Sequence, residues 1–118
     1  FSYIYILKII YKIMRWFVKK AVMSGYGWGN GYVVVPKGHP LYGVDNYEYY
    51  LSIHGGITFC SFGNDIDWPE VNLRDDDWVI GFDTAHSYDR SSDWSKSAVV
   101  KETKRLIKLV DQYQEKDT

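Results

Sequence analysis

Short apolar segments of strand length recur through the middle of the chain, separated by turn-forming residues. Aromatic and β-branched residues dominate these segments, a composition that favours β-strands. Turns rather than helical crossovers separate them, which indicates an antiparallel sheet in an α+β fold. The predicted strands are Tyr32–Val35, Tyr47–Ile53, Ile57–Phe62 and Trp78–Phe82, with a hairpin turn at His54-Gly55-Gly56 between the second and third.

The last segment of the chain has the periodicity of an amphipathic helix. Its apolar residues Val99, Leu106 and Val110 fall on one stripe. Ser95 or Ser97 can cap the N-terminus of this helix. We therefore expect a helix from about Lys96 to Gln114 that covers one face of the sheet.

The first 22 residues combine a broad apolar face with regularly spaced bases. The bases recur at intervals that place them on one stripe of a helix. The longest uncharged run, Phe1–Leu7, is too short to span a membrane. We expect residues 1–22 to form a basic amphipathic helix, peripheral to the core, that contacts an anionic membrane surface, another chain or the outside of the sheet. The bases on the stripe are Lys8, Lys12, Arg15 and Lys19.

Length and composition limit the class of protein and the kinds of cysteine site that the chain can contain. A chain of 118 residues, 46% hydrophobic and 18% aromatic, is long enough for one compact core and is unlike a disordered segment. We expect that core to be a single domain over residues 23–118. The single cysteine, Cys60, excludes an internal disulfide framework and a zinc site built of cysteines alone. Within its apolar strand, Cys60 is expected to be a small buried side chain rather than a nucleophile.

The net charge of −1 conceals a strong separation of charge along the chain. From residue 1 to Val44 the sequence contains bases and no acid, whereas Asp45–Trp94 is acidic apart from Arg74 and Arg90. Either the basic end packs near the acidic middle or both are simply solvated. The acidic middle would repel phosphates, so extended nucleic-acid binding is disfavoured.

Two segments resemble familiar ligand-binding loops but fail their patterns. Alternate glycines run from Gly25 to Gly31, yet Asn30 and Tyr32 stand where a G-x-G-x-x-G loop needs glycine. The acidic string DIDWPE, residues 65–70, has the wrong residues for an EF-hand. These segments are therefore expected to be a flexible lead into a strand and a solvated acidic loop.

Three histidines carry the candidate chemistry. His39 lies in a rigid Pro/Gly loop, and His54 follows a predicted strand. The strand Trp78–Phe82 is followed at once by Asp83, His86 and Asp89, which makes this strand end the most site-like feature of the chain. The histidines are far apart in sequence and form no metal signature, so no metal ligands and no cofactor are assigned.

Three strings in the chain, GYVVVPKGHPLYG, HGGITF and WVIGFDTAH, recur in this order in another group of proteins. The region from Trp28 to Asp89 resembles a family of small uncharacterised proteins encoded by bacteriophages and prophages. The resemblance implies a protein of the infected bacterium's cytoplasm and a role against host defence. The resemblance does not imply any particular activity.

Two functional classes remain open beside a purely structural role for the histidines. The first is a binding module, expected to form a homo-oligomer, that captures a small nucleotide-like ligand or a host protein. The second is a hydrolase in which His54, Asp83 and His86 bind a metal or act as acid and base on a phosphoester. The expected ligand-binding residues are His39, Tyr42, His54, Asp83 and His86, with Tyr26, Trp28, Tyr47 and Tyr50 as further stacking surfaces.

Overall fold

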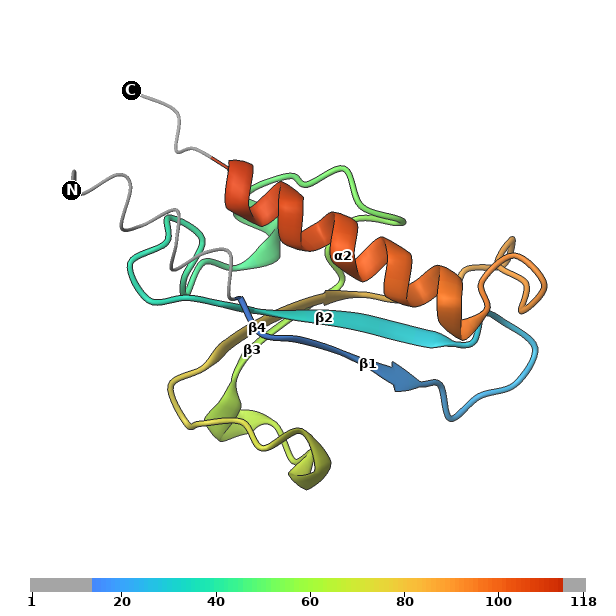
Figure 1. The fold of residues 1–118 in the computed structure, drawn as a ribbon, viewed down its shortest axis with the longest axis horizontal. Coiled ribbons are helices and arrows are strands. Elements are labelled where there is room, and N and C mark those ends of the chain that lie inside the picture. The colour runs from blue at the N-terminus through green and yellow to red at the C-terminus, as the bar shows by residue number, and fades with distance from the viewer. Residues whose placement is uncertain (1–13, 114–118) are drawn as a thin grey trace.

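The computed structural model describes residues 14–113 as an antiparallel sheet with one long helix packed across it (Figure 1). The strand order is β1-β2-β4-β3, and every neighbouring pair is antiparallel. This arrangement confirms the predicted α+β class. The main elements are β1 (Trp16–Lys20), β2 (Gly29–Val35), β3 (Phe59–Phe62), β4 (Trp78–Phe82) and α2 (Lys96–Gln112), and 3-10 turns cover Asn46–Glu48, Gly63–Asp65 and Pro69–Val71.

The two central strands, β2 and β4, are buried on both faces. Val33 and Ile80 point into the larger core beneath α2, while Val34 and Val79 belong to a smaller core on the opposite face. The loop between β3 and β4 covers that second face with Ile66, Trp68 and Leu73. The predicted strand Trp78–Phe82 is confirmed, and the predicted strand Tyr32–Val35 begins three residues earlier, at Gly29.

Helix α2 begins at the predicted residue. Ser95 is its N-cap, because the Ser95 side chain accepts a hydrogen bond from the Ala98 N–H at 3.3 Å. The buried stripe contains the predicted apolar residues and also Thr103, whose hydroxyl donates to the Val99 carbonyl. Gly31 of β2 faces this position, where any larger side chain would collide with Thr103. The helix and the sheet can therefore approach closely.

The prediction of a helix over residues 1–22 is wrong for Trp16–Lys20, which form β1; residues 1–13 lie outside the described residues. β1 pairs with β2 in register from Trp16 opposite Val33 to Lys20 opposite Gly29. The apolar side chains of Trp-Phe-Val also suit an edge strand, in which Phe17 and Val18 face opposite cores. Sheet pairing overrides the helical spacing, and the sheet includes residues before Met23.

The separated charges meet in the folded chain. Arg15 pairs with Asp77, Lys37 pairs with Asp76, and Lys19 Nζ lies 2.6 Å from Glu70 Oε1. Each pair joins the basic N-terminal region to the loop before β4. Of the two explanations for the charge separation, packing of the basic end against the acidic middle is the correct one for these three bases.

The predicted strand Tyr47–Ile53 is wrong. A 3-10 turn and irregular chain replace it, and the strand expected at Ile57–Phe62 is shortened to Phe59–Phe62. Leu51 and Ile53 are nevertheless buried in the core beneath α2. Leu51 and Ile53 are buried while Tyr50 and Ser52 are exposed, because this segment packs against the core beneath α2. It does so without pairing with a strand. The hairpin predicted around His54 is absent from the described sheet.

Among residues 14–113, no helix has the length and apolar character needed to cross a membrane.

Candidate functional site

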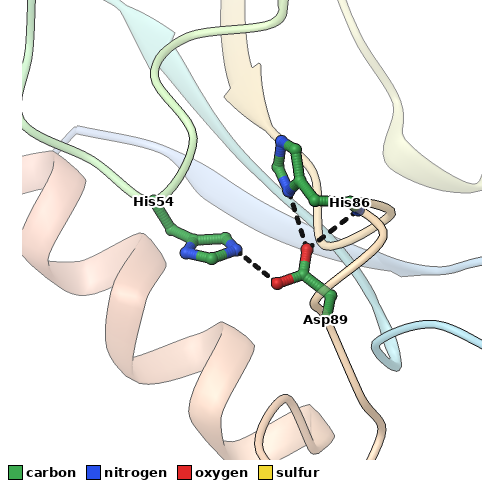
Figure 2. A group of neighbouring side chains, drawn as sticks. All are labelled: His54, His86 and Asp89. Atoms are coloured by element: carbon green, nitrogen blue, oxygen red, sulfur yellow. Dashed lines mark hydrogen bonds and ion pairs between the residues drawn. The ribbon is translucent and has the colours of Figure 1, made fainter.

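Two loops that are distant in sequence bring His54, His86 and Asp89 together (Figure 2). His54 Nε2–H donates to Asp89 Oδ1 at 2.8 Å, and His86 Nδ1–H donates to Asp89 Oδ2 at 2.7 Å. The two imidazole rings stand nearly perpendicular, with their centroids 5.2 Å apart. We call these three side chains the His–Asp–His cluster. One carboxylate therefore fixes the orientation of both rings.

The loop after β4 prepares Asp89 for this role. The Asp89 N–H donates to the His86 carbonyl, and the His86 N–H donates to Asp89 Oδ2 at 3.0 Å. The Asp89 side chain is 1% exposed, whereas those of His54 and His86 are 17% and 25% exposed. Burial raises the pKa of the Asp89 carboxyl, but hydrogen bonds from His86 and His54 outweigh burial and hold that pKa below its usual value. Asp89 is thus an ionised, buried carboxylate.

Aromatic and glycine neighbours hold the two rings in place. The Trp94 ring lies 4.2 Å from that of His54, and the Tyr88 ring stacks on His86 at 5.2 Å. Gly55, at φ +70°, lies so close to the His86 ring that a Cβ there would collide with it. These contacts were not predicted: the aromatic residues expected beside the histidines were Tyr26, Trp28, Tyr42, Tyr47 and Tyr50.

Helix α2 supports the loop that carries His54. The His54 N–H donates to Glu102 Oε2 at 2.9 Å, and Arg105 pairs with the same carboxylate at 2.8 Å. Arg105 also donates to the Ser52 carbonyl at 2.7 Å. The bond from Arg105 is the main reason that the pKa of Glu102 lies below its usual value. The ring of His54 is therefore positioned from its backbone as well as from Asp89.

Asp83 is close to the cluster but outside its hydrogen bonds. Its Oδ1 lies 3.8 Å from His86 Nε2, the ring nitrogen that points away from Asp89. The same oxygen accepts a hydrogen bond from the Ala85 N–H at 3.0 Å. Of the predicted site residues, the structure thus brings together His54, His86 and Asp83.

His39 lies in a different environment and belongs to the scaffold. Its ring is buried, with Nε2–H donating to the Val110 carbonyl at 2.7 Å and Nδ1 accepting from the Leu41 N–H at 3.0 Å. Burial lowers the pKa of His39, which favours the neutral ring. His39 therefore joins its loop to the C-terminal end of α2.

Tyr42 is also engaged away from the cluster. Its hydroxyl donates to the Asp76 carbonyl at 2.6 Å, and its ring meets the edge of Phe62. The predicted roles of His39 and Tyr42 in ligand binding thus find no support in their contacts.

The prediction did not include Tyr88, Trp94 or Glu102, and it placed Asp89 at the site-like strand end without counting it among the ligand-binding residues. Asp89 had a visible signal, because Asp83, His86 and Asp89 recur at every third position after a buried strand. Trp94 and Glu102 had none, since their contacts with His54 span 40 residues or more of the chain.

A shallow basic hollow adjoins the cluster on the exposed side of α2. Trp94 and Glu102, which both contact His54, form part of its lining. Its remaining charged residues are predominantly basic: Lys96, Lys101, Lys104, Arg105 and Lys108, against Asp93. The hollow places positive charge near His54.

The arrangement supports several kinds of chemistry. Asp89 fixes which nitrogen of each neutral ring carries the proton, so the other nitrogen is available to a ligand or a substrate. Two imidazoles and one carboxylate are also suitable ligands for a divalent transition metal. No family model, no curated protein and no solved structure matches the chain in comparisons with known proteins.

Proposed function

We propose that this protein is a small binding protein that captures a phosphate-bearing, nucleotide-like ligand at His54 and His86. The observation that carries the proposal is the buried Asp89 carboxylate, which orients two partly exposed imidazoles from one point. A protonated imidazole can donate inward to Asp89 and outward to a phosphate oxygen. Such charge-assisted hydrogen bonds are stronger and more directional than neutral ones.

The surroundings suit an anionic ligand with an aromatic base. Lysine side chains of the basic hollow attract phosphate, and Trp94 connects that hollow to His54. Tyr88 stacks on His86 while 65% of its surface stays exposed, which leaves ring surface for a planar base. Phosphate and base would thus be held by different neighbours of one cluster.

The biological setting is part of the proposal. The three strings that resemble bacteriophage and prophage proteins support a protein of the host cytoplasm that counteracts host defence, where sequestering a nucleotide signal would be sufficient. Capture of a host protein is the second form of this proposal. It becomes the leading form if no nucleotide is retained.

Hydrolysis of a phosphoester is the alternative function. It is favoured by the Asp89–His86 hydrogen bond, because a carboxylate that orients an imidazole is the arrangement of a general base. His54, held by the same carboxylate, would be the matching acid. The two functions differ in one respect: capture returns the ligand unchanged.

A retention experiment separates the two functions. The protein is incubated with cyclic mononucleotides and cyclic dinucleotides, desalted and heated, and the released compound is identified by chromatography. We expect an intact nucleotide, and we expect retention to be lost in His54→Ala and His86→Ala but kept in Asp67→Ala, which removes an exposed carboxylate of the acidic loop. An altered nucleotide would establish hydrolysis instead.

A further inference from the structure

The inner face of the His–Asp–His cluster has the character of a metal site. The ligand atoms of His54, His86 and Asp89 all lie within 4.8 Å of one another. From this geometry we infer that the cluster binds one divalent transition-metal ion of the zinc class, coordinated by His54 Nε2, His86 Nδ1 and the Asp89 carboxylate. The inference goes beyond ligand capture and stands without it, since the ion needs no nucleotide.

The charges around Asp89 favour a cation between the three groups. The described ion pairs of this buried carboxylate are both with histidines, which carry no charge when neutral. Arg105, a cation on the neighbouring helix, is already paired with Glu102. Asp89 is ionised, so a divalent ion between the three groups would meet an opposite charge held in place by the protein.

The spacing of the ligands fits an ion after a small adjustment. The facing nitrogen and oxygen atoms lie 2.8 Å and 2.7 Å apart, joined by hydrogen bonds. Metal–ligand bonds of about 2.0–2.2 Å in a tetrahedral site separate neighbouring ligands by roughly 3.3 Å, so the nitrogen–oxygen contacts would lengthen and the two ring nitrogens, within 4.8 Å of each other, would take up that separation. The ion takes the place of the two ring protons at the inner nitrogens, and each proton moves to the outer nitrogen of the same ring.

Imidazole nitrogens set the class of ion. Zinc, cobalt and nickel accept imidazole readily, whereas magnesium and calcium prefer sites made of oxygen alone. The remaining ligand, Asp89, is held by the His86 backbone N–H and keeps its orientation without either ring. Asp83 lies beside the outer nitrogen of His86, in the place where metal-bound histidines commonly meet a second carboxylate.

Metal binding would also prepare the two rings for an anionic ligand. With the inner nitrogens on the ion, the ring protons move to the outer nitrogens, which then become hydrogen-bond donors. Three protein ligands leave a coordination position free, and a phosphate oxygen suits it.

The direct test uses the metal alone. The full chain is freed of metal with a chelator and titrated with zinc chloride in a calorimeter, and a second sample is titrated with cobalt chloride and followed by visible absorption. We expect one ion per chain and the visible bands of cobalt bound to nitrogen and oxygen ligands. Zinc affinity should fall at least tenfold in each of His54→Ala, His86→Ala and Asp89→Asn.

Two controls keep the result decisive. Asp67→Ala removes an exposed carboxylate of the loop between β3 and β4, which covers the smaller core, and it should bind zinc like the wild type. Circular dichroism confirms that each variant is folded; if Asp89→Asn is not, the two histidine variants decide alone. Absence of stoichiometric binding to the wild type, or binding that survives both histidine substitutions, would overturn the metal site. Either result leaves nucleotide retention to be judged separately.

Discussion

The chain contains two kinds of histidine environment, and they differ in the partners of the rings. His39 bonds to backbone groups at Leu41 and Val110, inside the core. His54 and His86 bond to a side-chain carboxylate, Asp89, and remain partly exposed. A ring that satisfies backbone groups stabilises the fold. A ring held by a carboxylate through one nitrogen has its second nitrogen outside that bond.

The difference also concerns charge. At His39 the Nδ1 atom accepts a hydrogen bond, so protonation of that atom would break the bond with the Leu41 N–H. In the cluster, both rings donate to an ionised carboxylate, whose pKa their hydrogen bonds hold below its usual value. We therefore expect substitutions at His39 to reduce mainly the stability of the fold. Substitutions in the cluster should reduce mainly the binding of ligand or metal.

The largest effect on stability is expected from His39→Ala. The substitution removes the ring partner of the buried Leu41 N–H, whereas the Val110 carbonyl still accepts from the Tyr113 N–H, so we expect a cost of about 1–3 kcal/mol. His54→Ala should cost about 1 kcal/mol, because Asp89 keeps two hydrogen bonds from His86. Urea unfolding measures both free energies. Equal costs would show that the two environments do not differ in this way.

Gly55→Ala and Gly56→Ala form a matched pair within the loop of His54. Both residues have positive φ, so alanine costs about 1 kcal/mol at either position. Only the methyl group of an alanine at position 55 would collide with His86, since nothing lies within 4 Å of a Cβ at Gly56. We expect Gly55→Ala to weaken zinc binding at least tenfold and Gly56→Ala to leave it near the wild-type value. Similar losses in both variants would attribute the effect to backbone strain.

The pH dependence of stability should carry the signature of His39. Its pKa is lowered in the folded state, so below pH about 6.5 the unfolded chain takes up a proton that the folded chain resists. The free energy of unfolding should therefore fall as the pH decreases through that range. Urea unfolding at several pH values should show a shallower decrease in His39→Gln. An unchanged slope would contradict the neutral assignment of His39.

Tyr88→Leu should have the smallest effect on stability. Most of the ring is exposed, so the free energy of unfolding should change by less than about 0.5 kcal/mol. Nucleotide affinity should fall about fivefold or more if the ring stacks on a base. Inorganic phosphate, which has no base, provides the control in the same calorimetric assay. Equal losses for nucleotide and phosphate would remove the stacking role.

The sequence predicted the elements whose own residues show both an apolar pattern and its ends. Strand β4 and helix α2 each carry their own apolar pattern and boundaries, and both were located closely. Strand β1 was missed because its short apolar run fits both a helix and an edge strand, and pairing with β2 decides between them. Residues 47–53 were wrongly predicted to be a strand, because alternate burial does not require a strand partner.

The candidate site was predicted in part for a similar reason. Asp83, His86 and Asp89 are neighbours in sequence, so their proximity could be read from the spacing. The contact of His54 with Asp89 spans 35 residues and depends on the packing of two loops. The structural role of His39 depends on Val110, 71 residues away, and no local sequence pattern predicts this contact. Long-range partners, rather than residue types, separate the two environments.

The central claim is that His54 and His86 form the binding centre while His39 belongs to the scaffold. Because the chain contains three histidines, nuclear magnetic resonance of the ring signals tests this claim directly during titration with zinc chloride and then with a retained cyclic nucleotide. The account predicts that the signals of His54 and His86 shift while that of His39 stays in place. Shifts confined to His39, or equal shifts of all three, would contradict it.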